Sequence, residues 1–381
     1  MRTFQPSPWD DPSPLFTAEH RALARKLESD ASLERDADLH DAARVGRRLG
    51  ELGLYQHLAN ARALSLCVVR EALAYLSPLA DAVFAVQGLC MNPLVRVGRR
   101  DVVDAMVKGE RIGGFALTEP EAGSDVAAMK TRAAREGDHW VLDGEKTLIS
   151  NVGIAHHFVV FANADPAGGK KGISAFLVPA DAPGVELSRI ALSGDHPLGR
   201  VVLASCKLPK EALLGDVGQG LSLALGTLGV YRTTVGAAAL GMAWRALEET
   251  IGHVKRRVQF GKKLADLQLV QAALADMTTE LCAARLLVAN AAWHNDSDAS
   301  LSADVRRREL GRLASMAKMS ATESAQRIID RAVQLHGGMG VALGTKVEEL
   351  YREIRPLRIY EGATDVLKLV VAQSVLARAS S

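Results

Sequence analysis

The sequence has few of the features that mark secreted or zinc-binding proteins. Its 381 residues include only four cysteines, which are far apart and form no Cys-x-x-Cys or Cys/His pattern: Cys67, Cys90, Cys206 and Cys282. This argues against a metal site and against a disulfide framework, and it fits a reducing compartment. The formal net charge of only +2 gives no general attraction to nucleic acid or to an anionic membrane.

A membrane span and a secretory signal are not indicated either. No apolar run approaches the roughly 18 residues that a membrane helix requires. The first stretch, MRTFQPSPWDDPSPLF, is rich in proline and aspartate where a secretory signal would have an apolar core. We therefore expect a cytoplasmic protein that does not insert into a membrane and does not bind nucleic acid.

The residue pattern changes twice along the chain, which predicts three domains: 1–112, 113–214 and 215–381. Residues from about 17 to 110 begin with a threonine cap and repeat leucines at helical spacing. From about 113 to 212, short β-forming runs alternate with Gly, Pro and Asp, and Asp143-Gly144 between two of these runs predicts a hairpin. After LLGDVGQGL the pattern is helical to the end.

The C-terminal region has the strongest periodicity. Steps of three and four residues separate the members of one apolar stripe: Leu267, Val270, Leu274, Met277, Leu281, Ala284, Val288 and Ala291. The neighbouring helical segments are rich in alanine, which lets helix axes approach closely, so a four-helix bundle would bury this stripe. The predicted fold is mainly α with a central β domain: a helical N-terminal domain, a small β-barrel or sandwich domain and a C-terminal four-helix bundle.

Two motifs in the β region combine a strand with polar groups. FALTEPEAGSD, residues 115–125, is a strand that enters a loop, where free amides and the hydroxyls of Thr118 and Ser124 suit a polar ring edge or a phosphate. EKTLISN, residues 145–151, has the alternation of a half-buried strand. On pattern alone, an ordinary loop and an ordinary strand also explain these motifs.

Two helix ends in the C-terminal region carry residues suited to a dinucleotide. In RRVQFGKKLADLQ, residues 256–268, Arg257 suits a phosphate and Phe260 an apolar wall. A helix C-cap at Gly261 with a solvated basic end explains most of this motif equally well. QLHGGMG, residues 334–340, lets backbone N–H groups approach a pyrophosphate, but it lacks the Gly-x-Gly-x-x-Gly spacing and a preceding strand, which disfavours a Rossmann site.

One carboxylate has an unusual setting in IYEGATD, residues 359–365. Glu361 lies between Tyr360 and Gly362. On spacing alone it is a carboxylate at a helix start, which stabilises the helix that follows. The aromatic neighbour and the glycine instead favour a tight, poorly solvated pocket, where desolvation raises the pKa of a carboxyl group and makes it a useful proton acceptor.

Taken together and in this order, five motifs resemble the acyl-CoA dehydrogenase family: ALTEPEAGSD, GEKTLISN, RRVQFGKKLADLQLVQ, AVQLHGGMG and RIYEGATD. The resemblance runs from about residue 110 to the C-terminus. It implies the same three-domain fold and an FAD-dependent oxidoreductase, with FAD between the β domain and the bundle. Because a neighbouring subunit binds part of the FAD in this family, it also implies a homodimer or homotetramer.

The resemblance places two groups of residues at the FAD site. The group from the β domain would hold the edge of the isoalloxazine ring and border the thioester: Phe115, Leu117, Thr118, Gly123, Ser124, Leu148, Ile149 and Ser150. The group from the helical region would bind the rest of the cofactor, in part across the subunit interface: Arg257, Gln259, Phe260, Gln268, Gln334, Gly337, Gly338, Ala363 and Asp365.

The resemblance also implies a mechanism. The catalytic base falls on Glu361, which removes the α-proton of an acyl thioester while the β-hydride passes to flavin N5. A ribityl hydroxyl and the backbone N–H of Glu361 would polarise the thioester carbonyl. Some members carry the base on the first long bundle helix, where this chain has Tyr231, which cannot serve as a carboxylate base. The residues implied to bind the substrate are Ser124, Arg232 and Gly362.

The chain departs from the family pattern at four places. An acidic, glycine-rich loop is missing after ELGLYQHL, and Leu148 replaces the usual tryptophan. Gly229 replaces an aspartate, and SGDHPLGR, residues 193–200, replaces a segment that normally reads like RASDT. The last two departures lie where the family contacts coenzyme A, so acyl-CoA and an acyl group on a carrier protein are both possible substrates.

The leading function is therefore α,β-dehydrogenation of an acyl thioester, with an electron-transferring flavoprotein as the electron acceptor. Two alternatives keep the flavin: the same chemistry on an acyl-carrier-protein intermediate, and an oxidase that passes electrons to oxygen. A catalytically silent helical scaffold is disfavoured, because the YEG and glycine motifs are intact.

Overall fold

The computed structural model describes residues 15–29, 41–194, 196–297 and 303–379. The chain divides into two compact units. The first takes in residues from 1–36, 62–81 and 229–381, and the second takes in residues from 37–61 and 82–228.

Most of the described residues before position 110 lie in helices, as the leucine spacing predicts. Their bounds are α1 (Ala18–Ser29), α3 (Ala42–Glu51), α4 (Gln56–Asn60), α5 (Ala63–Leu76), α6 (Pro78–Arg96) and α7 (Arg100–Val107). Thr17 caps α1, since its Oγ1 accepts a hydrogen bond from the His20 N–H at 3.4 Å. Asp41 caps α3 in the same way, through the N–H groups of Ala43 and Arg44.

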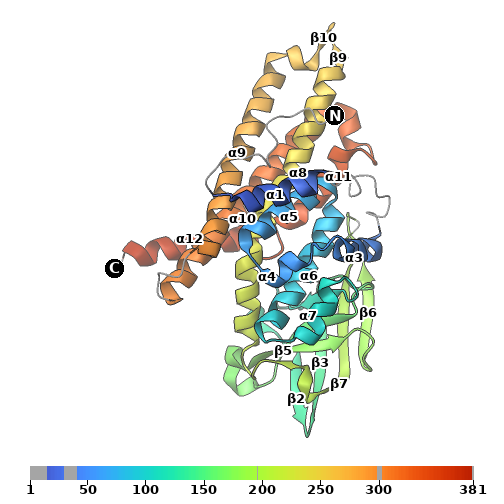
Figure 1. Cartoon of the computed structure of the whole chain (residues 1–381), viewed down its shortest axis with the longest axis vertical. Helices are drawn as coiled ribbons and strands as arrows, with labels where there is room; N and C mark the ends of the chain where they lie inside the picture. The colour runs from blue at the N-terminus through green and yellow to red at the C-terminus, as the bar shows by residue number, and fades with distance from the viewer. Residues whose placement is uncertain (1–14, 30–40, 195, 298–302, 380–381) are drawn as a thin grey trace. The chain divides into compact units, whose positions relative to one another are not determined.

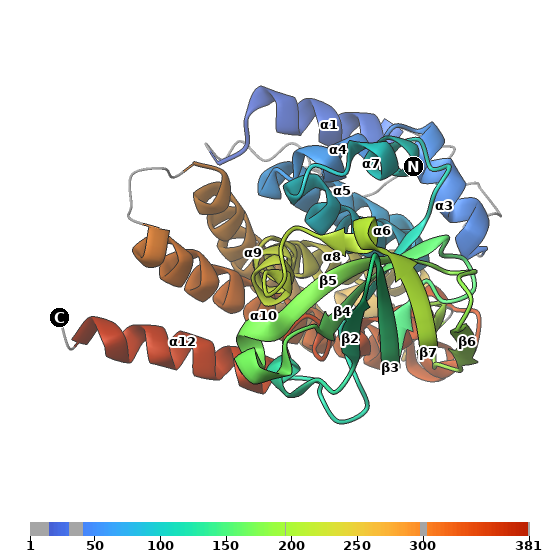
Figure 2. The same ribbon diagram turned by 90° about the horizontal axis from the view of Figure 1, so that it is seen from below.

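The predicted β domain is confirmed as one eight-stranded sheet. Its strands are β1 (Gly113–Ala116), β2 (Arg132–Glu136), β3 (His139–Ser150), β4 (His157–Asn163), β5 (Ile173–Pro179), β6 (Val185–Ile190), β7 (Leu198–Pro209) and β8 (Leu213–Leu214). They run in the order β6-β7-β3-β2-β4-β5-β8, and β1 pairs with β4 in parallel. Figure 2 shows β2, β3 and β7 beside one another. Trp140, Phe158 and Phe176 are among the residues that form the core of this sheet.

The hairpin predicted at Asp143-Gly144 is wrong, because both residues lie inside β3. The chain turns earlier, at Gly137, whose φ is 58°. Gly144 instead belongs to an irregularity in the pairing of β3 with β7, where the Ser205 N–H donates to Asp143 Oδ1 at 2.6 Å. A Cβ on Gly144 would lie 2.5 Å from Thr131 Oγ1, so glycine is needed here for a close approach rather than for a turn.

The C-terminal region is helical, as predicted. Its elements are α8 (Gly220–Arg256), the strands β9 (Val258–Gln259) and β10 (Lys262–Lys263), and α9 (Gln268–Ser297), α10 (Ala303–His336), α11 (Lys346–Leu357) and α12 (Thr364–Ala379). Figure 1 shows the β9–β10 hairpin at the end where α8 passes into α9. A Cβ on Gly236 of α8 would lie 2.9 Å from Val288 of α9 and 3.3 Å from Ala321 of α10, so small residues do allow these helices to pack closely.

Most of the predicted apolar stripe lies on the buried face of α9. Its buried members are Val270, Met277, Leu281, Ala284, Val288 and Ala291. Leu274 is only half-buried, and Leu267 lies just before the helix. The predicted helical period is therefore confirmed, and the first residue of the stripe, Leu267, belongs to the turn before α9.

Two helices have the length and composition of a membrane span, contrary to the expectation from the sequence. They are Pro78–Arg96 and Gly220–Arg256, each with a mean hydropathy of 1.2 over 18 residues. In the most apolar windows, however, 89% and 67% of the residues are buried within the protein. Core helices meet the same criteria, so this finding is weak support for a membrane location.

Candidate active site

Glu361 lies in the turn between α11 and α12, in a backbone conformation that non-glycine residues rarely adopt. Its φ is 53°, and that of Gly362 is 112°. Two cations hold the carbonyl groups of this turn. Arg232 Nε on α8 donates to Glu361 O at 3.0 Å, and Lys318 Nζ on α10 donates to Gly362 O at 2.8 Å. A left-handed conformation at a glutamate persists only where the surroundings fix it, and here two bundle helices do so.

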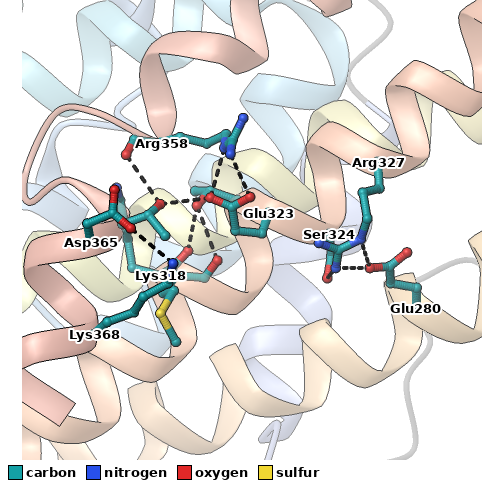
Figure 3. Close-up of polar contacts among 11 residues, drawn as sticks. Glu280, Lys318, Glu323, Ser324, Arg327, Arg358, Asp365 and Lys368 are labelled. Atoms are coloured by element: carbon teal, nitrogen blue, oxygen red, sulfur yellow. Dashed lines mark hydrogen bonds and ion pairs between the residues drawn. The ribbon is translucent and has the colours of Figure 1, made fainter. Parts of the chain in front are cut away.

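A second group of contacts fixes both ends of the turn to α10. Arg358 Nε donates to Glu323 Oε1 at 2.8 Å, and the Thr364 hydroxyl donates to the same oxygen at 2.9 Å. Figure 3 shows the contact of Arg358 with Glu323, and both Glu323 and Lys318 lie on α10. Asp365, a predicted cofactor residue, is exposed in the first turn of α12 and pairs with Lys368 at 3.0 Å. The turn is therefore fixed at both ends, and Ala363, another predicted cofactor residue, lies within it.

The carboxyl group of Glu361 is placed as a proton acceptor requires. Its Oε2 is buried and has no hydrogen-bond partner among the described residues, although the residue as a whole is only half-buried. Burial raises the pKa of this carboxyl group, and the positive charges of Arg70, Lys318 and Arg232 oppose that rise. The result is a poorly solvated acid that forms no direct ion pair with any residue that the structure describes.

Arg70 and Asp81, which no motif indicated, form a buried ion pair that influences this acid. Arg70 on α5 donates from Nε and Nη2 to the two oxygens of Asp81 on α6, both at 2.8 Å. Its Nη1 donates to Thr234 Oγ1 at 2.9 Å. The only sequence signal was the presence of charged residues within two apolar segments, CVVREALAYL and PLADAVFAV.

Tyr231, the residue at the alternative base position, is a buried phenol. Its hydroxyl has no hydrogen-bond partner among the described residues, and burial raises its pKa. It therefore remains protonated, in agreement with the expectation that it cannot replace a carboxylate. The next residue, Arg232, was predicted to bind the substrate, and its Nε is occupied by the Glu361 carbonyl.

The residues predicted to bind the dinucleotide across an interface lie at helix ends on the protein surface. The rings of His253 and His336 stack with centroids 4.4 Å apart, which brings the ends of α8 and α10 together. The hairpin that follows α8 leaves the ring of Phe260 92% exposed. The other exposed members of the set are Arg257, Gln259, Gln268, Gln334, Gly337 and Gly338.

Gly261 is part of a hairpin turn and not the helix C-cap considered as an alternative. Phe260 and Gly261 form a two-residue connection between β9 and β10 with φ values of 52° and 73°. Positive φ at both positions is typical of a type I′ turn, which matches the twist of paired strands.

In the second compact unit, the two motifs predicted to hold the ring edge lie side by side. The Thr147 N–H donates to Thr118 O at 2.9 Å, just beyond the end of β1. The pairing of β3 with β7 is irregular between Lys146 and Ile149, and there Leu148 has a φ of 55° and is 56% exposed. Ile149 is buried in the sheet core, so only its backbone could contact a ligand.

A buried ion pair joins these two motifs. Lys146 Nζ lies 2.7 Å from Glu119 Oε1 and donates to Leu117 O at 3.2 Å. Glu119 also accepts from the backbone N–H groups of Lys130 and Thr131. Burial lowers the pKa of Lys146 to about 8, while Lys146 and the backbone donors keep the pKa of Glu119 below its ordinary value.

The loop after Glu119 leaves Gly123 and Ser124 exposed. A Cβ on Gly123 would meet nothing within 4 Å, and its φ is not in the left-handed region. Nothing within the described chain therefore requires glycine at this position. Phe115, at the other end of the motif, packs against Phe161 with ring centroids 4.9 Å apart.

Ser150 has a partner that no motif indicated. His196 Nε2 lies 2.6 Å from Ser150 Oγ, and His196 Nδ1 is buried without a hydrogen-bond partner among the described residues. Burial, with a smaller contribution from Arg189, lowers the pKa of His196 to about 4. His196 belongs to SGDHPLGR, the segment that departs from the family pattern. The described residues contain no group of His, Cys, Asp and Glu side chains that could hold a metal ion.

Comparisons with known proteins agree with these motifs. The family model for the acyl-CoA dehydrogenase middle domain matches residues 114–206, and the model for the acyl-CoA dehydrogenase C-terminal domain matches residues 218–376. A 3-(aryl)acrylate reductase of Clostridium sporogenes is 40% identical over 293 residues, or 75% of each chain. The caffeyl-CoA reductase-Etf complex subunit CarC of Acetobacterium woodii is 36% identical over 82% of each chain. Human mitochondrial short-chain specific acyl-CoA dehydrogenase is 38% identical over 76% of this chain and 69% of its own.

Solved structures show the same similarity. Butyryl-CoA dehydrogenase from Megasphaera elsdenii superposes with a TM-score of 0.83 at 30% identity, over 93% of this chain and 96% of its own. An acyl-CoA dehydrogenase from Bacillus anthracis in complex with FAD has a TM-score of 0.87 at 28% identity, over 96% of this chain and 69% of its own.

Proposed function

Because the chain belongs to the acyl-CoA dehydrogenase family, we propose that it uses Glu361 to remove the α-proton of an acyl thioester. Members of this family are FAD-dependent oxidoreductases that act on CH–CH bonds. The observation that carries the proposal is the state of the Glu361 carboxyl group, whose Oε2 is buried and lacks a hydrogen-bond partner among the described residues.

The surroundings of Glu361 suit a general base in three ways. Burial raises its pKa, which makes the carboxylate a better proton acceptor. The contacts from Arg232 and Lys318 fix the peptide and therefore limit the directions in which the carboxylate can point. The backbone N–H of Glu361 donates to no group among the described residues, so it is free to stabilise negative charge on a thioester oxygen.

The residues present fit FAD. Glu361 Oε2 is buried without a hydrogen-bond partner in the described chain, and Leu148, in one of the motifs predicted to hold the ring edge, is 56% exposed. Thr118, Leu148 and Ser150 would hold the ring edge, while Arg257 and Gln259, with the glycines of QLHGGMG, would hold the dinucleotide part of a neighbouring subunit's cofactor. When bound, FAD supplies the hydride acceptor. The protein contributes the base, the placement of the thioester and the exclusion of water.

The assembly state, the cell compartment and the electron acceptor belong to the same proposal. A homodimer or homotetramer is supported by bulky apolar side chains exposed near the proposed cofactor residues, among them Phe260 at 92% and Leu269 at 87%. An electron-transferring flavoprotein as acceptor is supported by the name of the Acetobacterium relative, which belongs to a reductase-Etf complex. A cytoplasmic location is supported by the cysteine content alone.

A second function, reduction of an α,β-unsaturated thioester, is favoured by two of the relatives. Both the Clostridium sporogenes protein and the Acetobacterium protein are named reductases. The same residues would serve in the reverse direction, with protonated Glu361 delivering a proton to the α-carbon and reduced FAD supplying the hydride to the β-carbon. A raised pKa suits this role too, because it keeps a larger fraction of the acid protonated near neutral pH.

Anaerobic mixing of the FAD-loaded enzyme with thioesters tests the proposal. Short, branched, aromatic and long acyl-CoA esters are each added while the absorbance of the oxidised flavin is recorded. Loss of the yellow colour with one class identifies a dehydrogenase substrate, while reoxidation of pre-reduced enzyme by an aryl-acryloyl thioester identifies a reductase. If acyl-carrier-protein esters bleach the flavin and acyl-CoA esters do not, the substrate is an acyl group bound to a carrier protein. Silence in every arm would contradict it.

A further inference from the structure

We infer that His196 is a positioning residue that fixes the direction of the Ser150 hydroxyl toward the flavin ring edge and thereby lowers the reduction potential of the bound cofactor. This inference rests on the proposed function, in which Ser150 lies at that edge. The contact that carries it is the 2.6 Å separation of His196 Nε2 and Ser150 Oγ.

The surroundings of the imidazole favour one arrangement of its proton. A neutral histidine carries a hydrogen on one nitrogen and a lone pair on the other. Nδ1 is buried without a hydrogen-bond partner among the described residues. Leaving a buried N–H unpaired is rarer in proteins than leaving an acceptor unpaired, so the hydrogen belongs on Nε2. His196 then donates to Ser150 Oγ.

This arrangement makes Ser150 a donor toward any further partner. A hydroxyl has one hydrogen and two lone pairs. When His196 occupies one lone pair, the Ser150 hydrogen is directed away from the imidazole. Ser150 is half-buried at the end of β3, and the next residue, Asn151, is fixed because its Nδ2 donates to Gly113 O at 2.9 Å. The backbone that carries the hydroxyl is therefore held in place.

A fixed donor distinguishes the two redox states of a flavin. The oxidised ring edge offers lone pairs at N5 and O4, whereas the reduced ring carries a hydrogen on N5. A hydroxyl held as a donor therefore pairs with the oxidised ring and opposes the N5 hydrogen of the reduced ring. His196 thus stabilises the oxidised cofactor relative to the reduced one.

His196 lies in SGDHPLGR, residues 193–200, the segment in which this chain departs from the usual pattern of the family. The imidazole remains neutral near neutral pH, because burial and Arg189 lower its pKa to about 4. It therefore acts through a hydrogen bond and not through a charge.

The test compares the midpoint potential of FAD in the holoenzyme and its variants, measured against a reference dye without any thioester. His196→Ala is expected to raise the ratio of reduced to oxidised flavin at a fixed poise roughly three- to tenfold, the effect of about one neutral hydrogen bond. For a two-electron couple, this corresponds to about 15–30 mV. His196→Gln, which retains an N–H donor at similar reach, is expected to stay near the wild-type potential.

Two controls separate this role from a structural one. His139→Ala removes an exposed histidine at the start of the same strand, and we expect no change in potential. In a Ser150→Ala background, His196→Ala is expected to have no further effect, since the hydroxyl that it directs is gone. An unchanged potential in His196→Ala would overturn the inference, and so would an equal shift in the Ser150→Ala background.

The tautomer provides a second readout. In the holoenzyme labelled with ¹⁵N-histidine, the His196 signals are expected to be those of a ring protonated at Nε2; protonation at Nδ1 would also overturn the inference. Because neither measurement uses a substrate, these outcomes are distinct from the failure of the thioester-mixing experiment, which would contradict the proposed function instead.

Discussion

Replacing Lys146 by methionine is expected to destabilise the β domain by about 3–5 kcal/mol, the usual effect of removing one partner of a buried ion pair. The side chain of Lys146 is completely buried, and its Nζ lies 2.7 Å from Glu119 Oε1. Without the lysine, the Glu119 carboxylate keeps its hydrogen bonds from the Lys130 and Thr131 backbone but loses its counter-charge. The lost ion pair is the one that joins the two motifs predicted to hold the ring edge.

The double variant Lys146→Met/Glu119→Gln is expected to be less destabilised than Lys146→Met alone. Glutamine retains a carbonyl oxygen for one backbone N–H and removes the unpaired charge. Breaking a buried pair is strongly destabilising mainly because it leaves one charge uncompensated, whereas replacing both partners is often close to neutral. Whether the double variant has a higher or a lower free energy of unfolding than Lys146→Met therefore tests the electrostatic part of the argument.

Chemical denaturation at one fixed protein concentration measures these differences. In a background with the other three tryptophans replaced by phenylalanine, the fluorescence of Trp140 serves as a local probe, because its ring packs against Phe176 in the core of the sheet with centroids 5.2 Å apart. Lys207→Met is the matched control, since Lys207 is exposed on β7 and changes there usually alter the free energy of unfolding by less than about 0.5 kcal/mol. The reasoning is refuted if Lys146→Met behaves like this control, or if the double variant is less stable than Lys146→Met.

Two further predictions concern the charges around Glu361. Because only the carboxylate accepts a proton and burial raises its pKa above the ordinary value of 4.5, kcat/KM for dehydrogenation should fall as the pH decreases through that raised pKa; a profile that stays flat down to pH 4.5 would contradict this. Arg70→Met should destabilise the helical unit by about 3–5 kcal/mol, since it leaves the Asp81 carboxylate buried and unpaired. The same change removes the positive charge that most strongly opposes the raised pKa of Glu361, so the acidic limb of the kcat/KM profile should move to higher pH, and a move to lower pH would disprove the assignment of charges.

The order of helices and strands could be predicted because it depends on local periodicity. The stripe that includes Met277, Leu281 and Ala284 lies on the buried face of α9. The hairpin prediction at Asp143-Gly144 was wrong because an Asp-Gly pair occurs both in hairpin turns and at irregular positions inside strands. Here a cross-strand contact to Ser205 and the close approach of Thr131 retain it within one long strand.

The site was only partly predictable, because many of its contacts join residues that are far apart in the sequence. Glu361 stood out because its neighbours in the chain indicated a poorly solvated pocket, and its Oε2 is indeed buried. Burial raises its pKa, and the positive charges that oppose this rise come from helices distant in sequence; an arginine at position 70 or a lysine at position 318 gives no sign in the sequence of what it will face. The same holds for His196, whose partner Ser150 lies 46 residues away.

The most direct test of the account is the rate at which an acyl-CoA ester bleaches the flavin in Glu361→Gln. The amide has nearly the shape of the acid but cannot accept the proton, so the variant should bind FAD and remain yellow. Its anaerobic bleaching should be slower than that of the wild type by ~10²- to 10⁴-fold. Bleaching at the wild-type rate would mean that another group removes the proton, and the role assigned to Glu361 would be wrong.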